Sequence, residues 1–334
     1  MSIDWVYNLR DATSITGKKR VIEQALVSSR LGSGSAHCFL YNCYLSHNPF
    51  FVYGIEHIPE TFGISNTENP WRDFWGVLEG MRTNTFGSRT ILKFINEIKY
   101  QFGSEEWNLI VRPVFLKRFV PELRINEIKR LLDNTEWKIP VFNCQTIGEV
   151  IDNRQHLSGK KTLEPRLPGI RALAMITNSN VVLYDKSGNP LVGFSEVSHE
   201  LDENKAIFSV LSNFGSIMLD GVITMGDEKS YPQFNIFDII PLSEFISGDC
   251  TIQQSERRDI LKTISRSDNI VSKNSHVKVL NGIEVDLDTS EGYNIMQRYA
   301  KYCAYQGFGE IIIKDLNSIY AQTSSDAWVR YLLK

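Results

Sequence analysis

The chain has 334 residues, enough for two ordinary domains, and its 42% hydrophobic and 22% charged residues are typical of a folded globular protein. This composition excludes collagen-like, low-complexity and intrinsically disordered chains. The formal net charge of -3 excludes a global basic field that would attract nucleic acid, but it leaves room for a local basic patch. No apolar run approaches the roughly 18 residues that cross a bilayer, and charged residues stand where a signal peptide would have its apolar core. We therefore expect a cytoplasmic protein without a membrane partner, in the host cytoplasm if the chain is viral.

The first 140 residues have the periodicity of α-helices, because apolar residues recur at intervals of three and four. Ser88 and Ser104 stand where N-caps are expected. Glycines and prolines interrupt the pattern between residues 30 and 70. The sequence predicts an all-α domain at 1–140, with helices at 19–29, 71–82, 89–102, 105–112 and 124–134.

After about Pro140 the pattern changes to short runs rich in Val, Ile and Phe, separated by turn residues. These runs predict strands at 171–177, 180–185, 216–225, 234–240, 276–285 and 309–315. Helical spacing recurs at 200–213, 253–266 and 289–305. The sequence therefore predicts an α+β domain at 141–334, with the domain boundary between residues 137 and 150.

Cysteines and histidines are dispersed along the chain and show no paired spacing typical of a metal site. The five cysteines are Cys38, Cys43, Cys144, Cys250 and Cys303. We expect buried free thiols and no metal held by nitrogen or sulfur ligands. The acidic run at 286–291 lacks the glycine and the final acid of a calcium loop, so we expect it to cap the helix that follows.

Six short elements of the second half follow one another in a particular order. They are RLPGIR (166–171), DKSGN (185–189), LDGV (219–222), FDIIPL (237–242), GEIIIK (309–314) and WVRYL (328–332). In this order and context they resemble the motifs of the adenylylation domain of ATP-dependent DNA ligases, in a form similar to the T4-phage type. Residues 81–95 and 108–132 resemble the helical DNA-binding domain that precedes this core in the family.

The resemblance implies an α+β fold in which an N-terminal all-α DNA-binding-like domain (1–140) precedes a nucleotidyltransferase domain of antiparallel sheets and helices (141–334). The chain ends directly after the last element, so we expect it to lack the family's C-terminal OB-fold domain.

The chain departs from the family at the residues that carry the chemistry. In the family, the lysine of K-x-D-G-x-R attacks the α-phosphate of the nucleotide, but here Arg166 and Pro168 replace the lysine and the aspartate. Arginine cannot serve as this nucleophile because its guanidinium stays protonated. The two glutamates of the family's metal site align with Val222 and Gly309. Glu310 follows one position late, and we expect its side chain to point to the opposite face of the strand.

These replacements predict no catalytic residue, no metal site and no cofactor. The remaining positions of a degenerate nucleotide pocket are Arg166, Arg171, Lys186, Asp220, Phe237, Lys314 and Arg330. Arg330 aligns with one of two family lysines that hold the triphosphate, and Lys186 aligns with a family arginine. Asp220–Gly221 could be a remnant of a metal site, but we favour a turn. Phe237 could stack on a purine, but we favour a core position.

A lysine that has moved into the site is the alternative to an inactive protein, and Lys160 and Lys161 lie upstream of Arg166. The active form would use ATP and Mg²⁺. Alternation along an extended segment places Lys161 on the opposite face from Arg166 and leaves Lys160 far from it.

Two basic clusters stand out. The first predicts a phosphate-contacting face on the helical domain, and it consists of Arg112, Lys117, Arg118, Arg124, Lys129 and Arg130. The alternative is a solvated helix face, since Glu122 and Glu127 dilute the charge. For the second cluster we favour a solvated helix face, and it consists of Arg257, Arg258, Lys262 and Arg266.

Three hypotheses of function follow from these observations. In the first, the chain is a catalytically inactive DNA-ligase-like protein that binds duplex DNA or a replication or transcription protein, in a phage. In the second, it is a divergent ATP-dependent DNA ligase or nucleotidyltransferase with a displaced nucleophile. In the third, the fold serves as a structural or assembly subunit. We favour the first because the nucleophile and both metal carboxylates are replaced together.

Overall fold

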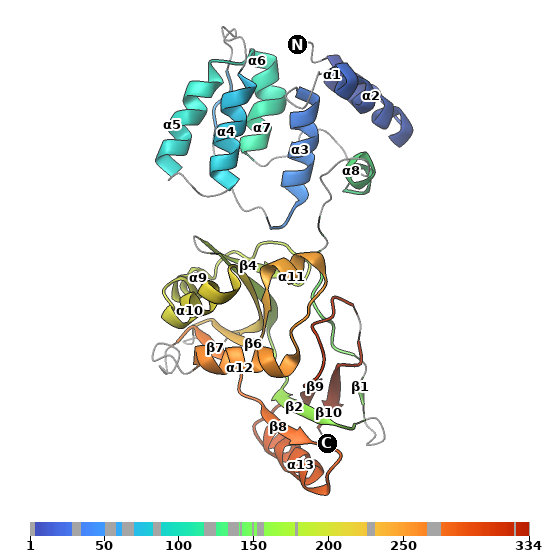
Figure 1. The fold of residues 1–334 in the computed structure, drawn as a ribbon, viewed down its shortest axis with the longest axis vertical. Helices are drawn as coiled ribbons and strands as arrows, with labels where there is room; N and C mark the ends of the chain where they lie inside the picture. The colour runs from blue at the N-terminus through green and yellow to red at the C-terminus, as the bar shows by residue number, and fades with distance from the viewer. Residues whose placement is uncertain are drawn as a thin grey trace. The chain divides into compact units, whose positions relative to one another are not determined.

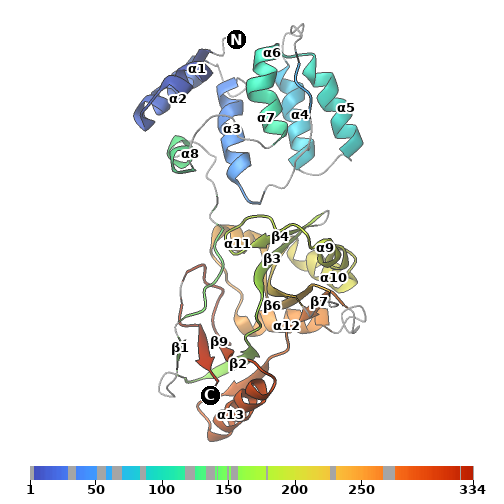
Figure 2. The ribbon, with the colours of Figure 1, turned by 180° about the vertical axis from the view of Figure 1, so that it is seen from behind.

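The computed structural model separates into two compact units, Met1–Pro140 and Val141–Lys334 (Figures 1 and 2). The residues that the structure describes are 4–28, 35–50, 58–61, 70–82, 88–116, 125–132, 140, 142–148, 150–151, 157–177, 180–225, 231–265, 275–323 and 325–333. Among these residues, no helix is long and apolar enough to cross a membrane.

Every described element of the first unit is a helix. The elements are α1 (Asp4–Asp11), α2 (Ile15–Ser28), α3 (Ser35–His47), α4 (Trp71–Arg82), α5 (Ser88–Lys99), α6 (Ser104–Glu106), the π-helical turn η1 (Trp107–Val111), α7 (Arg112–Phe115) and α8 (Ile125–Leu132). In α5, the buried residues Ile91, Ile95 and Ile98 recur at helical spacing and join a core that contains Phe74 and Phe102. The prediction of a helical first half is confirmed.

Three details of the first unit differ from the predicted helices, and the first is that α1 was not predicted. Helix α3 was not predicted, because its segment is apolar and aromatic on all sides and so lacks the amphipathic periodicity. The helix predicted at 105–112 continues to Phe115 through a π-helical turn, in which the Arg112 N–H donates to the Trp107 carbonyl. Pro113 follows directly and cannot donate a backbone hydrogen bond, so the widened turn lets the helix continue past it.

The second unit contains two five-stranded sheets, both largely antiparallel. The first sheet has the order β1-β10-β9-β2-β8, and its strands are β1 (Val150–Ile151), β10 (Trp328–Leu332), β9 (Glu310–Asp315), β2 (Lys160–Pro165) and β8 (Ile283–Asp286). The second has the order β4-β3-β5-β6-β7, and its strands are β4 (Asn180–Asp185), β3 (Ile170–Thr177), β5 (Ile217–Thr224), β6 (Gln233–Pro241) and β7 (Val277–Val279). The α+β class predicted for this half is confirmed.

The described residues of the second unit also form helices. They are α9 (Ser195–Asp202), α10 (Lys205–Phe214), α11 (Leu242–Ser247), α12 (Gln254–Ser265) and α13 (Ser290–Tyr305). Helices α9, α10 and α12 pack on the sheet that contains β3 and β5, whereas α13 packs on the sheet that contains β9 (Figure 1). In β9, Ile311 and Ile313 face α13, so strand alternation turns Ile312 and Lys314 to the opposite face.

Two predicted elements of the second unit are each divided in the structure. The helix predicted at 200–213 is α9 followed by α10, and the Asn204 side chain between them accepts a hydrogen bond from the Ile207 N–H at 3.3 Å. The strand predicted at 276–285 is β7 followed by β8, which belong to different sheets. The chain crosses between the sheets at Gly282, where a Cβ would lie 2.8 Å from the Leu163 carbonyl oxygen.

Candidate functional site

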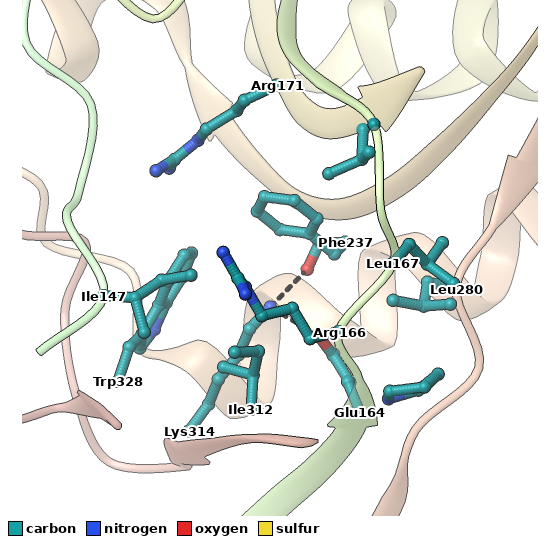
Figure 3. Close-up of a pocket in the computed structure, with 13 residues that line it drawn as sticks. Ile147, Glu164, Arg166, Leu167, Arg171, Phe237, Leu280, Ile312, Lys314 and Trp328 are labelled. Atoms are coloured by element: carbon teal, nitrogen blue, oxygen red, sulfur yellow. Dashed lines mark hydrogen bonds and ion pairs between the residues drawn. The ribbon is translucent and has the colours of Figure 1, made fainter. Parts of the chain in front are cut away.

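A cavity of about 180 Å³ lies between the two sheets of the second unit (Figure 3). Both sheets contribute to its walls. The lining residues include Glu164, Arg166, Arg171, Phe237, Lys314 and Trp328. This volume is below the roughly 300–1,000 Å³ of typical small-molecule pockets, so the cavity fits a group no larger than a nucleobase.

The loop that joins β2 to β3 forms one wall of the cavity and depends on a glycine. Gly169 has a φ of +153°, and a Cβ at this position would collide with the carbonyl oxygen of Ile223 on β5. Only glycine therefore allows the loop to approach β5 closely. The same loop is tied to the other sheet, because the Arg166 N–H donates to the Glu310 carbonyl at 3.0 Å.

Arg166 lies at the rim of the cavity and is paired with Glu310. Its guanidinium donates to Glu310 Oε2 at 2.7 Å, and Arg330 lies on the other side of the carboxylate, with its Nη1 3.8 Å from Oε1. Strand alternation places Glu310 on the same face of β9 as Lys314. The carboxylate of Glu310 therefore lies on the cavity face of β9, where it contacts Arg166.

Lys314 is the one lysine among the described residues that line the cavity, and its amine is held on several sides. Its Nζ lies 2.8 Å from Glu164 Oε2 and donates to the Phe237 carbonyl at 3.0 Å. The same atom lies 4.5 Å from the centre of the Phe237 ring and 4.3 Å from that of Trp328, which are cation–π distances. Arg258 donates to the other oxygen of Glu164 at 2.6 Å, so one buried carboxylate joins two cations.

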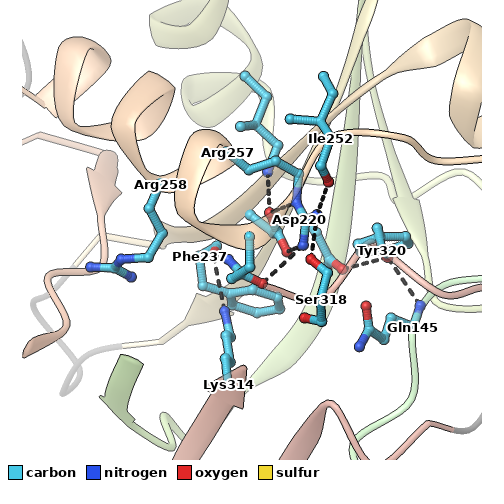
Figure 4. Close-up of polar contacts among 12 residues, drawn as sticks. Gln145, Asp220, Phe237, Ile252, Arg257, Arg258, Lys314, Ser318 and Tyr320 are labelled. Atoms are coloured by element: carbon cyan, nitrogen blue, oxygen red, sulfur yellow. Dashed lines mark hydrogen bonds and ion pairs between the residues drawn. The ribbon is translucent and has the colours of Figure 1, made fainter. Parts of the chain in front are cut away.

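Arg171 and Asp220 form a bidentate ion pair beside the cavity. Arg171 Nε and Nη2 donate to Asp220 at 3.0 and 2.6 Å, and the Tyr320 hydroxyl donates to the same carboxylate at 2.8 Å (Figure 4). Burial lowers the pKa of Arg171, but the charge and hydrogen bonds of Asp220 outweigh it, so the pKa is raised overall. Burial, followed by the charge of Asp220, raises the pKa of Tyr320.

The turn that we favoured at Asp220–Gly221 is wrong. Both residues lie inside β5, where Asp220 is fully buried, and the register with β6 shifts between them. Gly221 is required there, because a Cβ would lie 2.6 Å from the Asn235 carbonyl oxygen on β6. The bulge lets β5 pass close to its neighbour.

The second basic cluster is not a solvated face. Arg257 is fully buried and donates from Nε and Nη2 to Asp238 at 2.8 and 3.1 Å (Figure 4). Arg258 is 5% exposed and is bound to Glu164. Of the other two members, Lys262 is exposed and pairs with acidic side chains, and Arg266 lies outside the described residues.

The other predicted pocket positions divide between the cavity and the surface. Phe237 is half-buried and lines the cavity, so it is not a plain core residue. Lys186 is exposed in the turn after β4 and is not among the lining residues. The two upstream lysines are also remote from the lining, since Lys160 is exposed and Lys161 is paired with Asp315.

Divalent metal does not fit the residues at the expected position. The side chain of Val222 has no oxygen to offer, and the carboxylate of Glu310 is already bound by Arg166. In the described part of the chain, no group of three or more histidine, cysteine or acidic side chains gathers in a way that could hold a metal ion.

The chain is similar in structure to the solved proteins named "Pmar-Lig_Pre." and "Pmar-Lig_PreS3", with TM-scores of 0.50 and 0.49 and sequence identities of 20% and 21%. Both matches cover 98% of this chain and 77% of the other. The chain shares the fold of "Pmar-Lig_Pre.". A further similarity, with a TM-score of 0.42 and 13% identity over 57% of this chain and 68% of the other, is to the ATP-dependent DNA ligase of bacteriophage T7 in complex with ATP. No protein-family model and no curated protein matches the sequence.

The basic candidates in the helical unit have different surroundings. Arg112 binds within its own unit, because its Nε donates to the Ile58 carbonyl at 2.7 Å and its Nη1 to Glu60 at 3.1 Å. Lys129 and Arg130 are exposed on α8 and leave their charges available to solvent. The remaining three candidates, Lys117, Arg118 and Arg124, lie outside the described residues.

Several residues that line the cavity or bind its lining residues or their partners were not predicted as part of the site. Glu164 stands two positions before Arg166, and strand alternation alone would have placed the two side chains on one face. Arg258 and Tyr320 come from segments far along the chain, and no local pattern indicates that they bind Glu164 and Asp220. These partners depend on how the two sheets pack.

Proposed function

We propose that the chain is a catalytically inactive ligase-fold protein that binds DNA, or a protein partner, in DNA replication or transcription. The observation that carries this proposal is the pairing at position 166, where a guanidinium bound to Glu310 stands in place of a nucleophilic amine. A guanidinium stays protonated and offers no lone pair to phosphorus.

The surroundings of Lys314 support an inactive site. An amine that attacks phosphorus must lose its proton and approach in line with the leaving group. The Lys314 Nζ instead lies 2.8 Å from the Glu164 carboxylate and donates to the Phe237 carbonyl. An attack from this position would break both interactions.

The pairing of charges also argues against tight retention of a nucleoside triphosphate. The three cations that line the cavity are Arg166, Arg171 and Lys314, and each is already bound to a carboxylate of this chain. Phosphate groups would have to displace these carboxylates. The proposed protein therefore has no nucleotide cofactor.

The helical unit supports the DNA-binding part of the proposal. Lys129 and Arg130 are adjacent, exposed and located in the last turn of α8. Cations in such a position can neutralise backbone phosphates without reading base sequence. The resemblance to the family's helical DNA-binding domain covers the same helix.

Nick sealing on a labelled duplex tests the proposal. The chain is incubated with nicked DNA, ATP and Mg²⁺, and the same duplex is used to measure binding by fluorescence anisotropy. The proposal predicts binding that weakens with salt and no sealed strand. Sealing would instead favour a divergent ligase. If the chain shows no binding and no sealing, the result would favour a structural subunit.

The variant K129Q/R130Q should reduce the magnitude of the slope of log affinity against log salt by up to about 1.8, or about 0.9 for each phosphate that the variant no longer neutralises.

A further inference from the structure

Helix α13 presents one face to the protein and another to solvent. It begins at Thr289, whose hydroxyl accepts the Gly292 N–H at 3.0 Å, as expected for an N-cap. Met296, Ala300 and Cys303 are buried against the sheet that contains β9. In Figures 1 and 2 the helix lies at the edge of the second unit beside the C-terminus.

Four exposed side chains form a stripe on α13, which we term the tyrosine–cation stripe. It consists of Arg298, Lys301, Tyr302 and Tyr305. Their spacing of three, four and seven residues from Arg298 places them on one side of the helix. Tyr302 is 58% exposed and Tyr305 is 87% exposed, so both rings offer a large apolar surface to solvent.

No described neighbour neutralises the positive charges of the stripe. In the part of the chain that the structure describes, Arg298 and Lys301 form no ion pair. The one acidic residue of the helix is Glu291, seven positions before Arg298 and so about 10 Å away along the axis. The stripe therefore presents two cations and two aromatic rings without a carboxylate among them.

One of the rings is already oriented. Tyr302 stacks on the half-buried Tyr299, with ring centroids 6.4 Å apart and an interplanar angle of 29°. A ring held in this way loses less conformational freedom when a second flat group stacks on it.

We infer that the tyrosine–cation stripe binds single-stranded nucleic acid, with bases stacking on Tyr302 and Tyr305 and phosphates contacting Arg298 and Lys301. Exposed aromatic rings interleaved with cations are the combination by which proteins hold single strands without sequence preference. An apolar protein partner would require a continuous apolar patch, but the charged side chains of Arg298 and Lys301 adjoin these rings.

This surface is distinct from the cavity. Strand β9 separates the two, because Ile311 and Ile313 face α13 whereas Ile312 and Lys314 face the cavity. The inference therefore does not depend on whether the cavity is catalytic. It also concerns a different helix from α8, which carries the proposed duplex contact.

Fluorescence anisotropy of a labelled oligothymidylate of about 12 nucleotides tests the inference on the full chain. We expect Y302L/Y305L to weaken binding at least about fivefold, because leucine keeps an apolar side chain but has no flat face for stacking. Y302F/Y305F should bind as the wild type does. R298Q/K301Q should reduce the slope of log affinity against log salt by about 1.4, or about 0.7 for each cation.

Lys99 and Tyr100 provide a control, since Tyr100 is 70% exposed, Lys99 is half-buried and the Lys99 Nζ lies 5.6 Å from the Tyr100 ring centre. K99Q/Y100L should leave oligothymidylate binding unchanged. The inference is overturned if no oligonucleotide binds, if the leucine variant binds like the wild type, or if polyglutamate competes as well as oligothymidylate. If K129Q/R130Q loses duplex binding but still binds oligothymidylate, the result bears only on the proposed function and leaves this inference intact.

Discussion

Asp220 and Asp238 stand directly opposite each other across strands β5 and β6, and both are fully buried. Two like charges at cross-strand positions repel each other. Each carboxylate is instead held by its own arginine in a bidentate pair, Arg171 for Asp220 and Arg257 for Asp238. Tyr320 joins the two pairs, because its hydroxyl donates to Asp220 and its ring lies 5.8 Å from the Arg257 guanidinium. This cluster fixes one end of the cavity.

The first prediction concerns the stability of this cluster. R257M should lower the free energy of unfolding by about 3–5 kcal/mol, because it leaves Asp238 buried without its counter-ion. Chemical denaturation measures this change. K93M is the control, since Lys93 and Glu97 form an exposed pair with side chains that are 75% and 56% exposed, and such pairs contribute at most about 1 kcal/mol.

A double variant separates the charge effect from general disruption. R257M/D238L removes both charges, so it should recover part of the stability that R257M loses. If R257M/D238L instead loses as much free energy of unfolding as the two single variants together, the unpaired buried charge is not the cause of the destabilisation.

The second prediction concerns the thiol of Cys250, which lies near this cluster. Burial, followed by the charge of Glu244, raises its pKa from 9.0 to about 12. At pH 8 the thiolate fraction of Cys250 is therefore well below that of an unperturbed thiol. Iodoacetamide should modify Cys250 much more slowly in the folded chain than in urea, because burial also restricts access to the sulfur.

Deprotonation of the same thiol at high pH should lower the free energy of unfolding. Because the folded pKa is raised, the neutral thiol favours the folded state fully below about pH 9, and this contribution is lost as the pH rises toward about 12. C250A should flatten this part of the profile of unfolding free energy. An unchanged profile, or rapid alkylation of Cys250 in the folded chain, would contradict the assigned burial.

The third prediction concerns the loop that closes the cavity. G169A should lower stability by about 1–3 kcal/mol from backbone strain alone, with the clash against Ile223 in addition. G76A is the matched control, because Gly76 lies within α4 and a Cβ there meets no atom within 4 Å. This control should raise stability by about 0.5–1 kcal/mol. Equal effects of both substitutions would contradict the close approach of the loop to β5.

The fourth prediction concerns position 166 itself. R166K should not restore transfer of AMP from ATP, because a lysine there would still face Glu310, and Pro168 and Val222 would still replace two acidic residues of the family pattern. Intact mass after incubation with ATP and Mg²⁺ measures the transfer. An adduct on residue 166 of this variant would show that the rest of the site is competent.

Much of the fold could be predicted from the sequence, because periodicity and turn residues report directly on local structure. The class of each half and most helices follow in this way. Helix α3 could not be predicted, since its segment is apolar all round. The division of 276–285 between two sheets depends on Gly282, whose close approach to Leu163 is a tertiary contact.

The candidate site was predicted only in part, because the partners of its charges come from distant segments. Arg171, Phe237 and Lys314 do line one cavity, as the order of the motifs implied. Arg257 and Arg258 had the helical spacing of a solvated face, yet they are buried because Asp238 and Glu164 compensate their charges. A spacing pattern can identify the side of a helix but not its ion-pair partner.

The most direct test of the central claim is the intact mass of the purified chain after incubation with ATP, and separately with NAD, in the presence of Mg²⁺. An ATP-dependent ligase that forms the adenylate under the same conditions is the positive control. We predict an unchanged mass for this chain, because the protonated guanidinium at position 166 has no nucleophilic amine and the Lys314 amine is held by Glu164. A mass increase of one AMP, mapped by peptide sequencing to Lys314, Lys160, Lys161 or another lysine, would contradict the account and identify an active nucleotidyltransferase.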